Sequence, residues 1–320
     1  MSEKHVPVLL DEVIKFLNLQ ENTNVVDCNL GYGGHAAKLL EGIAPQGKLL
    51  GIDLDPLAIQ AVQKKFSQRK DFVGRYTLVH GNFADLNNIV NKQGVFPVQG
   101  ILFDLGLSSA QLDDQERGFS FKTEGHLDMR FDGESGGVDA SKILQTWPER
   151  KLADIFYYYG ELRKARQIAK KIVEMRKIQK FDRPSMLVEV VSQVCYHVPF
   201  NSALLARRKN PVPQVFQAIR IAVNSELENL ELALPQALEL LQSGGRIAVI
   251  SFHSLEDRIV KNFFKRESRD CVCPREIPLC VCGHKKTIQL ITKKPITPGR
   301  KEVTENSRAK SAKLRVVEKI

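Results

Sequence analysis

Short apolar runs alternate with helical patterns over the first hundred residues and again near residue 250. Between the runs, apolar residues recur at helical spacing, as in residues 56–66. Strands that alternate with helices indicate a parallel, doubly wound α/β sheet. The predicted strands cover residues 25–27, 48–53, 76–80, 98–104 and 246–252.

The pattern changes between about residues 113 and 212. This stretch contains polar turns and amphipathic helices such as Ala153–Tyr159 and Ala165–Met175, without strong strand alternation. We therefore expect a helical insertion at 113–212, between a first part of the sheet domain at 1–112 and a second part at 213–320. A helix is expected over Gln214–Leu230, with Pro235 ending it or starting the next one.

A glycine-rich turn follows the first strand and precedes a helical stretch. It contains Gly31, Gly33 and Gly34, and Asp53 ends the next strand. Such a turn lets the backbone approach a nucleotide-type cofactor, and an acid after the second strand accepts hydrogen bonds from ribose hydroxyls. The same glycines fit a dinucleotide site or an ordinary tight turn. Asp27, four residues before Gly31, favours a ligand with a cationic end, such as S-adenosylmethionine.

Other polar and aromatic residues follow the later strands, at the edge where ligands meet such sheets. Asp104 ends the fourth strand, and His253 follows the strand at 246–252. His253 suits a general base, a phosphate contact or a helix cap. Phe83, in the turn after the third strand, suits packing against an adenine ring or against the core.

The charge balance is basic and its excess is concentrated. The chain of 320 residues has 47 Lys and Arg against 37 Asp and Glu, a formal net charge of +10. Residues 283–320 hold 11 of these cations against 3 Glu, which predicts a basic C-terminal tail. A polyanionic partner is expected, with nucleic acid ahead of membrane, and residues 207–209 (Arg-Arg-Lys) form a second basic segment.

The chain shows no signal for membrane insertion or secretion. No run reaches the 18 apolar residues of a membrane span, and the N-terminus lacks an apolar leader. Six cysteines without a secretion signal favour a reducing, cytoplasmic setting. Four of them, Cys271, Cys273, Cys280 and Cys282, form either a surface hairpin with reduced thiols or a zinc site. Their Cys-x-Cys spacing favours the hairpin, so no metal is expected.

Several long strings resemble one family, the bacterial 16S ribosomal RNA (cytosine-N4)-methyltransferases (RsmH/MraW). They include Asp-x-x-Leu-Gly-x-Gly-Gly-His at 27–35 and Ser-Phe-His-Ser-Leu-Glu-Asp-Arg at 251–258. Further strings at residues 5–10, 51–56, 104–113, 117–121, 127–130, 216–227 and 308–315 extend the resemblance nearly end to end. The chain departs from the family pattern at Cys28-Asn29 and at 210–214 (Asn-Pro-Val-Pro-Gln).

The resemblance implies a class I S-adenosylmethionine-dependent methyltransferase, with a Rossmann-like sheet and an inserted helical substrate-recognition domain. It implies methylation of the exocyclic amine of a cytidine in the decoding region of 16S ribosomal RNA, with the small ribosomal subunit as partner. Either a monomer or a homodimer is compatible with the sequence. The implied cofactor residues are Gly33, Gly34, His35, Asp53, Phe83, Asp104 and Gln111.

Catalysis on a cytosine amine needs a group that accepts a proton, since the lone pair of N4 is delocalised into the ring. Asp104 and His253 are the candidates. Phe119 or Phe121 suits stacking on the base, or both residues fill the small core of the insertion. Two rival functions remain open. One is an NAD-dependent oxidoreductase, and the other is an RNA-binding ribosome-assembly factor with a vestigial cofactor fold.

Overall fold

A computed structural model describes residues 7–133, 137–197, 210–274, 276 and 279–320. The chain divides into two compact units: Met1–Gly106 with Leu227–Ile320, and Leu107–Glu226. In the sequence, the second unit lies between the two parts of the first unit. The second unit is therefore an insertion into the first. Within the described residues, no helix combines the length and the apolar character needed to cross a membrane.

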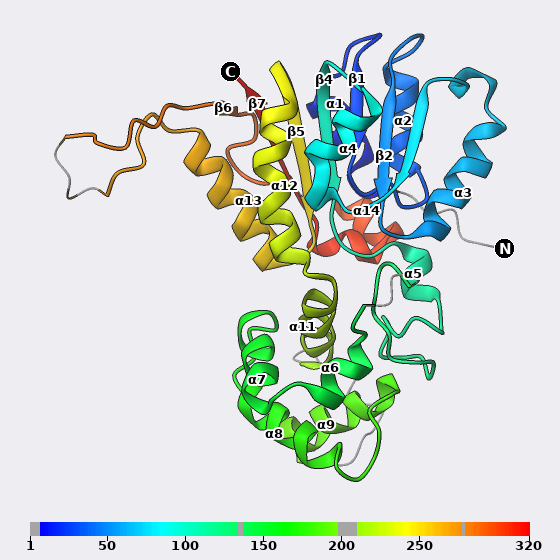
Figure 1. Ribbon diagram of the computed structural model, residues 1–320, viewed down its shortest axis with the longest axis vertical. Helices are drawn as coiled ribbons and strands as arrows, with labels where there is room; N and C mark the ends of the chain where they lie inside the picture. The colour runs from blue at the N-terminus through cyan, green and yellow to red at the C-terminus, as the bar shows by residue number, and fades with distance from the viewer. Residues whose placement is uncertain (1–6, 134–136, 198–209, 275, 277–278) are drawn as a thin grey trace. The chain divides into compact units, whose positions relative to one another are not determined.

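The first unit contains a seven-stranded sheet in the order β3-β2-β1-β4-β5-β7-β6 (Figure 1). Strands β1 to β5 are parallel, and β7 is antiparallel to both β5 and β6. The predicted parallel α/β sheet is confirmed. The strands are β1 (Asn24–Asp27), β2 (Leu49–Asp53), β3 (Tyr76–His80), β4 (Val98–Asp104), β5 (Leu241–Ser251), β6 (Ile288–Leu290) and β7 (Lys313–Lys319).

Helices cover both faces of this sheet because successive strand residues point to opposite sides. Val25 and Leu102 pack with one set of helices, whereas Val26 and Phe103 pack with the other. The first set is α1 (Leu10–Leu17), α2 (Gly34–Gly42) and α3 (Pro56–Ser67). The second set is α4 (Leu86–Gln93), α12 (Glu226–Leu240) and α13 (Ser254–Glu267). The short helices η1 (Lys70–Phe72), η2 (Phe83–Asp85), α14 (Arg300–Glu305) and η3 (Ser307–Ser311) complete the unit.

The predicted basic C-terminal tail is corrected by the structure, because this segment carries two strands of the sheet. Leu314 and Val316 are fully buried, and β7 lies between β5 and β6. Its cations are partly neutralised: Arg315 Nε lies 2.7 Å from Asp257 Oδ1, and Lys313 Nζ lies 3.1 Å from Asp257 Oδ2. Burial of apolar side chains, not charge, determines the path of this segment.

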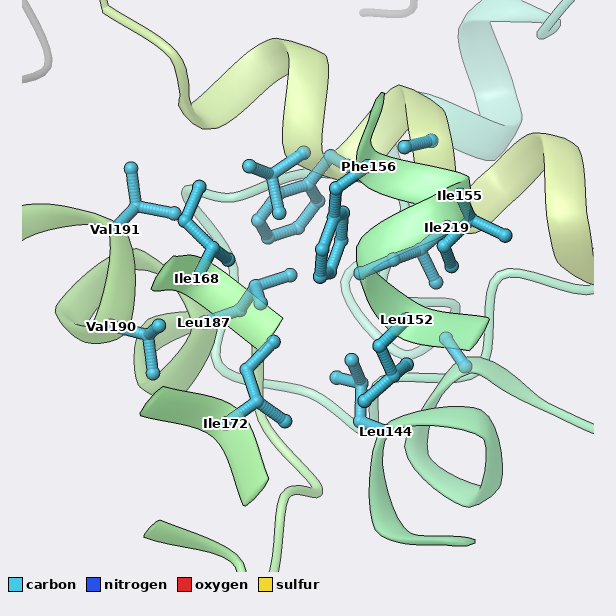
Figure 2. Packing of buried hydrophobic residues seen from close by; sticks show 14 of the residues in the cluster. Leu144, Leu152, Ile155, Phe156, Ile168, Ile172, Leu187, Val190, Val191 and Ile219 are labelled. Carbon is cyan, nitrogen blue, oxygen red and sulfur yellow. The ribbon is translucent and has the colours of Figure 1, made fainter. Parts of the chain in front are cut away.

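All the regular elements that the structure describes in the second unit are helices. These are α5 (Ser109–Asp113), α6 (Ala140–Thr146), α7 (Glu149–Tyr158), α8 (Ala165–Met175), α9 (Pro184–Tyr196) and α11 (Val212–Asn224). Phe156, Leu152, Leu187 and Ile172 converge in its core (Figure 2). Phe119 is also buried there and stacks on Phe131 at 5.8 Å, which favours a packing role.

The second unit extends beyond the predicted interval of 113–212 at both ends. Helix α11 belongs to it because Val215 and Ile219 are buried in its core. The helix expected over Gln214–Leu230 is interrupted at Ser225, whose φ of 49° is left-handed, and Pro235 lies inside α12 instead of breaking it. The basic segment at 207–209 lies outside the described residues.

Candidate active site

Three carboxylates stand at the ends of adjacent parallel strands. Asp27 ends β1, Asp53 ends β2 and Asp104 ends β4. Since β1 lies between β2 and β4, all three reach the same edge of the sheet. Strands β2 and β3 are added on one side of β1, whereas β4 and β5 are added on the other side, so the strand order reverses between β1 and β4. Ligands of open α/β sheets bind at such a switch point.

The glycine turn after β1 is held by Asp53. Its Oδ2 accepts a hydrogen bond from the Gly31 N–H at 2.7 Å, and its Oδ1 accepts one from the Asp55 N–H at 2.8 Å. Burial raises the pKa of Asp53 to about 6, although these two N–H groups oppose the rise. Apart from Gly31 and its chain neighbours, no atom of the described residues lies within 4 Å of the place where a side chain on Gly31 would begin, so this part of the structure leaves open space there.

Gly33 and Gly34 are required for packing in addition to any contact with a ligand. Gly33 has a φ of 70°, and a Cβ on it would lie 3.0 Å from Val62. A Cβ on Gly34 would clash with the ring of Pro7. Larger residues at either position would displace the start of α2.

His35, in the first turn of α2, joins the turn to the end of β4. Its Nδ1 lies 3.3 Å from Asp104 Oδ2, and its Nε2 lies 3.1 Å from the carbonyl oxygen of Val8. Both ring nitrogens therefore face acceptors, which is the arrangement of an imidazolium. Burial lowers the pKa of His35, but the hydrogen bond and charge of Asp104 outweigh burial and raise it overall.

Buried acceptor oxygens without a hydrogen-bond donor lie at and just after the ends of β1 and β4. Among the described residues they are Asp27 Oδ2, Asn29 Oδ1 and Asp104 Oδ1. Burial raises the pKa of Asp27 to about 7, with Asp104 adding to the rise and His35 opposing it. Buried acceptors of this kind ordinarily have partners, so the cluster calls for a ligand with N–H donors or positive charge. Asn29 was not among the predicted site residues, and its only sequence signal was the departure from the family pattern.

Phe83 is half-buried at the start of η2. Its ring meets Phe103 edge-on, with 5.7 Å between the ring centroids. One part of the ring thus belongs to the core beneath the sheet edge. The accessible part leaves room for the predicted contact with an adenine ring.

His253 is the N-cap of α13. Its Nδ1 accepts a hydrogen bond from the Glu256 N–H at 3.5 Å, and Glu256 Oε2 accepts from the His253 N–H at 3.2 Å. This is a capping box with histidine in the place of serine or threonine. The Nε2 atom lies 3.1 Å from Glu256 Oε1 but without hydrogen-bond geometry.

Gln111 belongs to the second unit, where it is buried in α5. Its Oε1 accepts a hydrogen bond from the Ser108 N–H at 3.0 Å, and Ser108 Oγ accepts from the Gln111 N–H at 3.2 Å. These two hydrogen bonds form a capping box, so Ser108 and Gln111 together stabilise the start of α5. The cofactor role of Gln111 stays a prediction.

Comparison with known proteins places these features in one family. The model of the MraW methylase family matches residues 2–320. The chain is 45% identical over 320 residues to the protein named ribosomal RNA small subunit methyltransferase H of Thermomicrobium roseum, covering 100% of this chain and 95% of the relative. It is also 45% identical over 320 residues to the same-named protein of Carboxydothermus hydrogenoformans, covering 100% and 99%. A solved rRNA methylase from Streptococcus thermophilus is 11% identical, with a TM-score of 0.44 and 99% of each chain covered.

Proposed function

The chain belongs to the MraW methylase family, and we propose that it transfers a methyl group from S-adenosylmethionine to N4 of a cytidine in the decoding region of 16S ribosomal RNA. Relatives with 45% identity over the whole chain are named small-subunit ribosomal RNA methyltransferases. Membership of a methylase family excludes the oxidoreductase alternative. One observation carries the proposal. At the switch point of the sheet, the structure describes buried acceptor oxygens that receive no hydrogen bond.

We assign the cofactor to the edge formed by the ends of β1, β2 and β4. Asp53 would accept from the ribose hydroxyls, and the Gly31–His35 turn would contact the cofactor through its backbone. Asp27 Oδ2 and Asn29 Oδ1 would accept from the ammonium group, which offers three N–H donors. Phe83 would lie against the adenine. When bound, S-adenosylmethionine supplies a methyl group that its sulfonium already activates.

We assign Asp104 to accept a hydrogen bond from the exocyclic amine of the cytidine. His35 holds its Oδ2, which leaves Oδ1 as the oxygen that can accept an N4–H hydrogen bond. Accepting that hydrogen bond directs the nitrogen lone pair out of conjugation with the ring and gives the departing proton an acceptor. A carboxylate has several lone pairs, so Asp104 can also border the cofactor. The main contribution of the protein is then placement of the amine in line with the methyl group.

The substrate cytidine must be unstacked to reach a site at a sheet edge. Sequence-specific enzymes that act on a base take it from an unpaired segment or extrude it from a helix. The excess of positive charge in this chain would bind the surrounding phosphates and make the affinity fall as salt rises.

A methyl-transfer assay on two substrates tests this proposal. Purified chain is incubated with radiolabelled S-adenosylmethionine and either isolated small subunits or naked 16S RNA, beside an Asp104→Asn variant. We expect label in RNA with the wild-type chain and a loss of at least 100-fold in kcat with the variant. RNA binding without transfer on either substrate would instead favour the assembly-factor alternative.

A further inference from the structure

Four cysteine thiols converge in the loop between α13 and β6. The Sγ atoms of Cys271, Cys273, Cys280 and Cys282 all lie within 4.8 Å of one another. Cys280 and Cys282 sulfurs are 3.6 Å apart, and Cys271 and Cys282 sulfurs are 3.8 Å apart. A tetrahedral ion with zinc–sulfur bonds of about 2.3 Å holds its sulfurs about 3.8 Å apart. These two separations agree with that geometry and are far longer than the ~2.05 Å of a disulfide bond.

Backbone N–H groups point at the sulfurs of this cluster. The Cys273 N–H donates to Cys271 Sγ at 3.4 Å, and the Val272 N–H donates to Cys282 Sγ at 3.5 Å. The backbone N–H of His284 also donates to Cys282. Such hydrogen bonds stabilise thiolates, the form of cysteine that binds metal ions. The ring of His284 lies outside the cluster, with Nε2 3.1 Å from the carbonyl oxygen of Arg266.

The large apolar side chains that the structure describes in this loop are exposed. Leu279 and Val281 are 78% and 76% exposed, although they flank Cys280 on both sides. Its ends are tied by the Thr287 N–H, which donates to the Glu267 carbonyl oxygen at 2.9 Å. Between these ends, the converging sulfurs are the feature that could offset the conformational entropy lost on ordering the loop.

We propose that Cys271, Cys273, Cys280 and Cys282 bind one Zn²⁺ ion in a closed tetrahedral site. Four S–H groups lose their protons on binding, no electrons are transferred, and the resulting group carries a net charge of −2. Soft thiolate ligands select zinc over magnesium or calcium. Since all four positions are filled by sulfur, the site has no place for a reacting water and acts structurally. It is independent of the methyl-transfer chemistry.

Metal analysis of the full chain tests the assignment. The protein is purified in reducing buffer, supplied with Zn²⁺, dialysed and measured by mass spectrometry of the elements. We expect one zinc per chain in the wild type and in a Cys195→Ala control, whose cysteine lies in α9. Cys282→Ser should lose at least 90% of the metal. Replacement of zinc by Co²⁺ should give the intense charge-transfer bands of tetrahedral thiolate coordination.

A second measurement on the wild-type chain avoids any dependence on the folding of the variant. Addition of a zinc chelator should make four further thiols reactive and should accelerate proteolysis between residues 268 and 287. A chain that takes up no zinc while its four thiols react freely would overturn the proposal. Iron in place of zinc, or disulfides among these cysteines in the chain as isolated under reducing conditions, would overturn it as well.

Discussion

Asp27 shows how a single buried carboxylate makes stability depend on pH. It is 1% exposed, its Oδ1 accepts from the Asn29 N–H at 3.2 Å, and its Oδ2 has no donor among the described residues. Its pKa is about 7 in the folded chain and near 3.9 in an unfolded one. The folded state therefore binds more protons between these values, and the contribution of Asp27 to stability falls as the pH rises from about 4 toward 7.

We expect Asp27→Asn to stabilise the ligand-free chain at pH 8, because a buried charge is removed. The melting temperature should rise by a few degrees relative to the wild type, and the difference should shrink at pH 5, where Asp27 is protonated. Scanning calorimetry at both pH values measures this. Asp71→Asn, at an exposed acid paired with Arg69, serves as the control and should shift neither value appreciably. A variant that is less stable than the wild type at pH 8 would contradict this role.

Asp53 can be tested separately through cofactor affinity. Asp53→Asn keeps an acceptor for one of the N–H groups of Gly31 and Asp55 but removes the charge that we assign to the ribose. We expect the Kd for S-adenosylmethionine to rise about 10- to 100-fold. This rise corresponds to the loss of charged hydrogen bonds that contribute about 1.5–3 kcal/mol to binding. Isothermal titration calorimetry measures it. An unchanged Kd would remove Asp53 from the cofactor site.

At the scale of single elements, the start of α13 depends on the side chains of the buried Glu256 and the partly buried His253. Glu256 is 2% exposed and accepts from the N–H groups of Phe252 and His253. His253 returns the contact through Nδ1, so the histidine at the exit of β5 is engaged in local structure. Its catalytic role stays a prediction that substitution can separate from capping.

His253→Ala should destabilise the chain by about 1 kcal/mol through loss of the cap, whereas His253→Asn, which keeps a capping side chain, should lose less than half of that. Urea unfolding gives both values. Methyl transfer by His253→Asn should stay within a few-fold of the wild type if the residue only caps the helix. A loss of kcat above 10-fold at retained stability would show that the ring takes part in the reaction.

Elements with local signals could be predicted from sequence, and those that depend on distant partners could not. The glycine turn and the strand ends at Asp27, Asp53 and Asp104 follow from short apolar runs and turn residues. The contact of His35 with Asp104 could not be predicted, since it depends on the register of β4 beside β1. The capping role of His253 was one of several open possibilities, because histidine is not a usual N-cap residue.

At the scale of the whole molecule, the C-terminal segment shows that charge can hide a strand. Residues 313–319 (Lys-Leu-Arg-Val-Val-Glu-Lys) mix buried apolar residues with cations, and the excess of cations suggested a tail. Their strand pairs antiparallel with β6 and with β5, and β5 lies more than sixty residues earlier in the chain. The same segment binds Asp257 of α13 through Lys313 and Arg315, which no local pattern could reveal.

Deletion of residues 313–320 should therefore abolish folding of the first unit, and not merely weaken RNA binding. The deletion removes the fully buried Leu314 and Val316 and leaves β5 and β6 without their shared neighbour. Circular dichroism and thermal melting should show loss of the cooperative transition. Lys301→Gln with Lys310→Gln, two exposed cations in the same basic region, should melt like the wild type. A truncated chain that melts cooperatively near the wild-type temperature would contradict the buried role of β7.

The most direct measurement is nucleoside mass spectrometry of 16S ribosomal RNA after reaction with S-adenosylmethionine that carries a deuterated methyl group. We predict N4-methylcytidine with three deuterium atoms, confined to one position in the decoding region, and none with Asp104→Asn. Deuterated methyl on a ring carbon, on a ribose hydroxyl or on another base would contradict the assignment of the amine to Asp104. Absence of label from both naked RNA and small subunits would contradict methyl transfer to this RNA altogether.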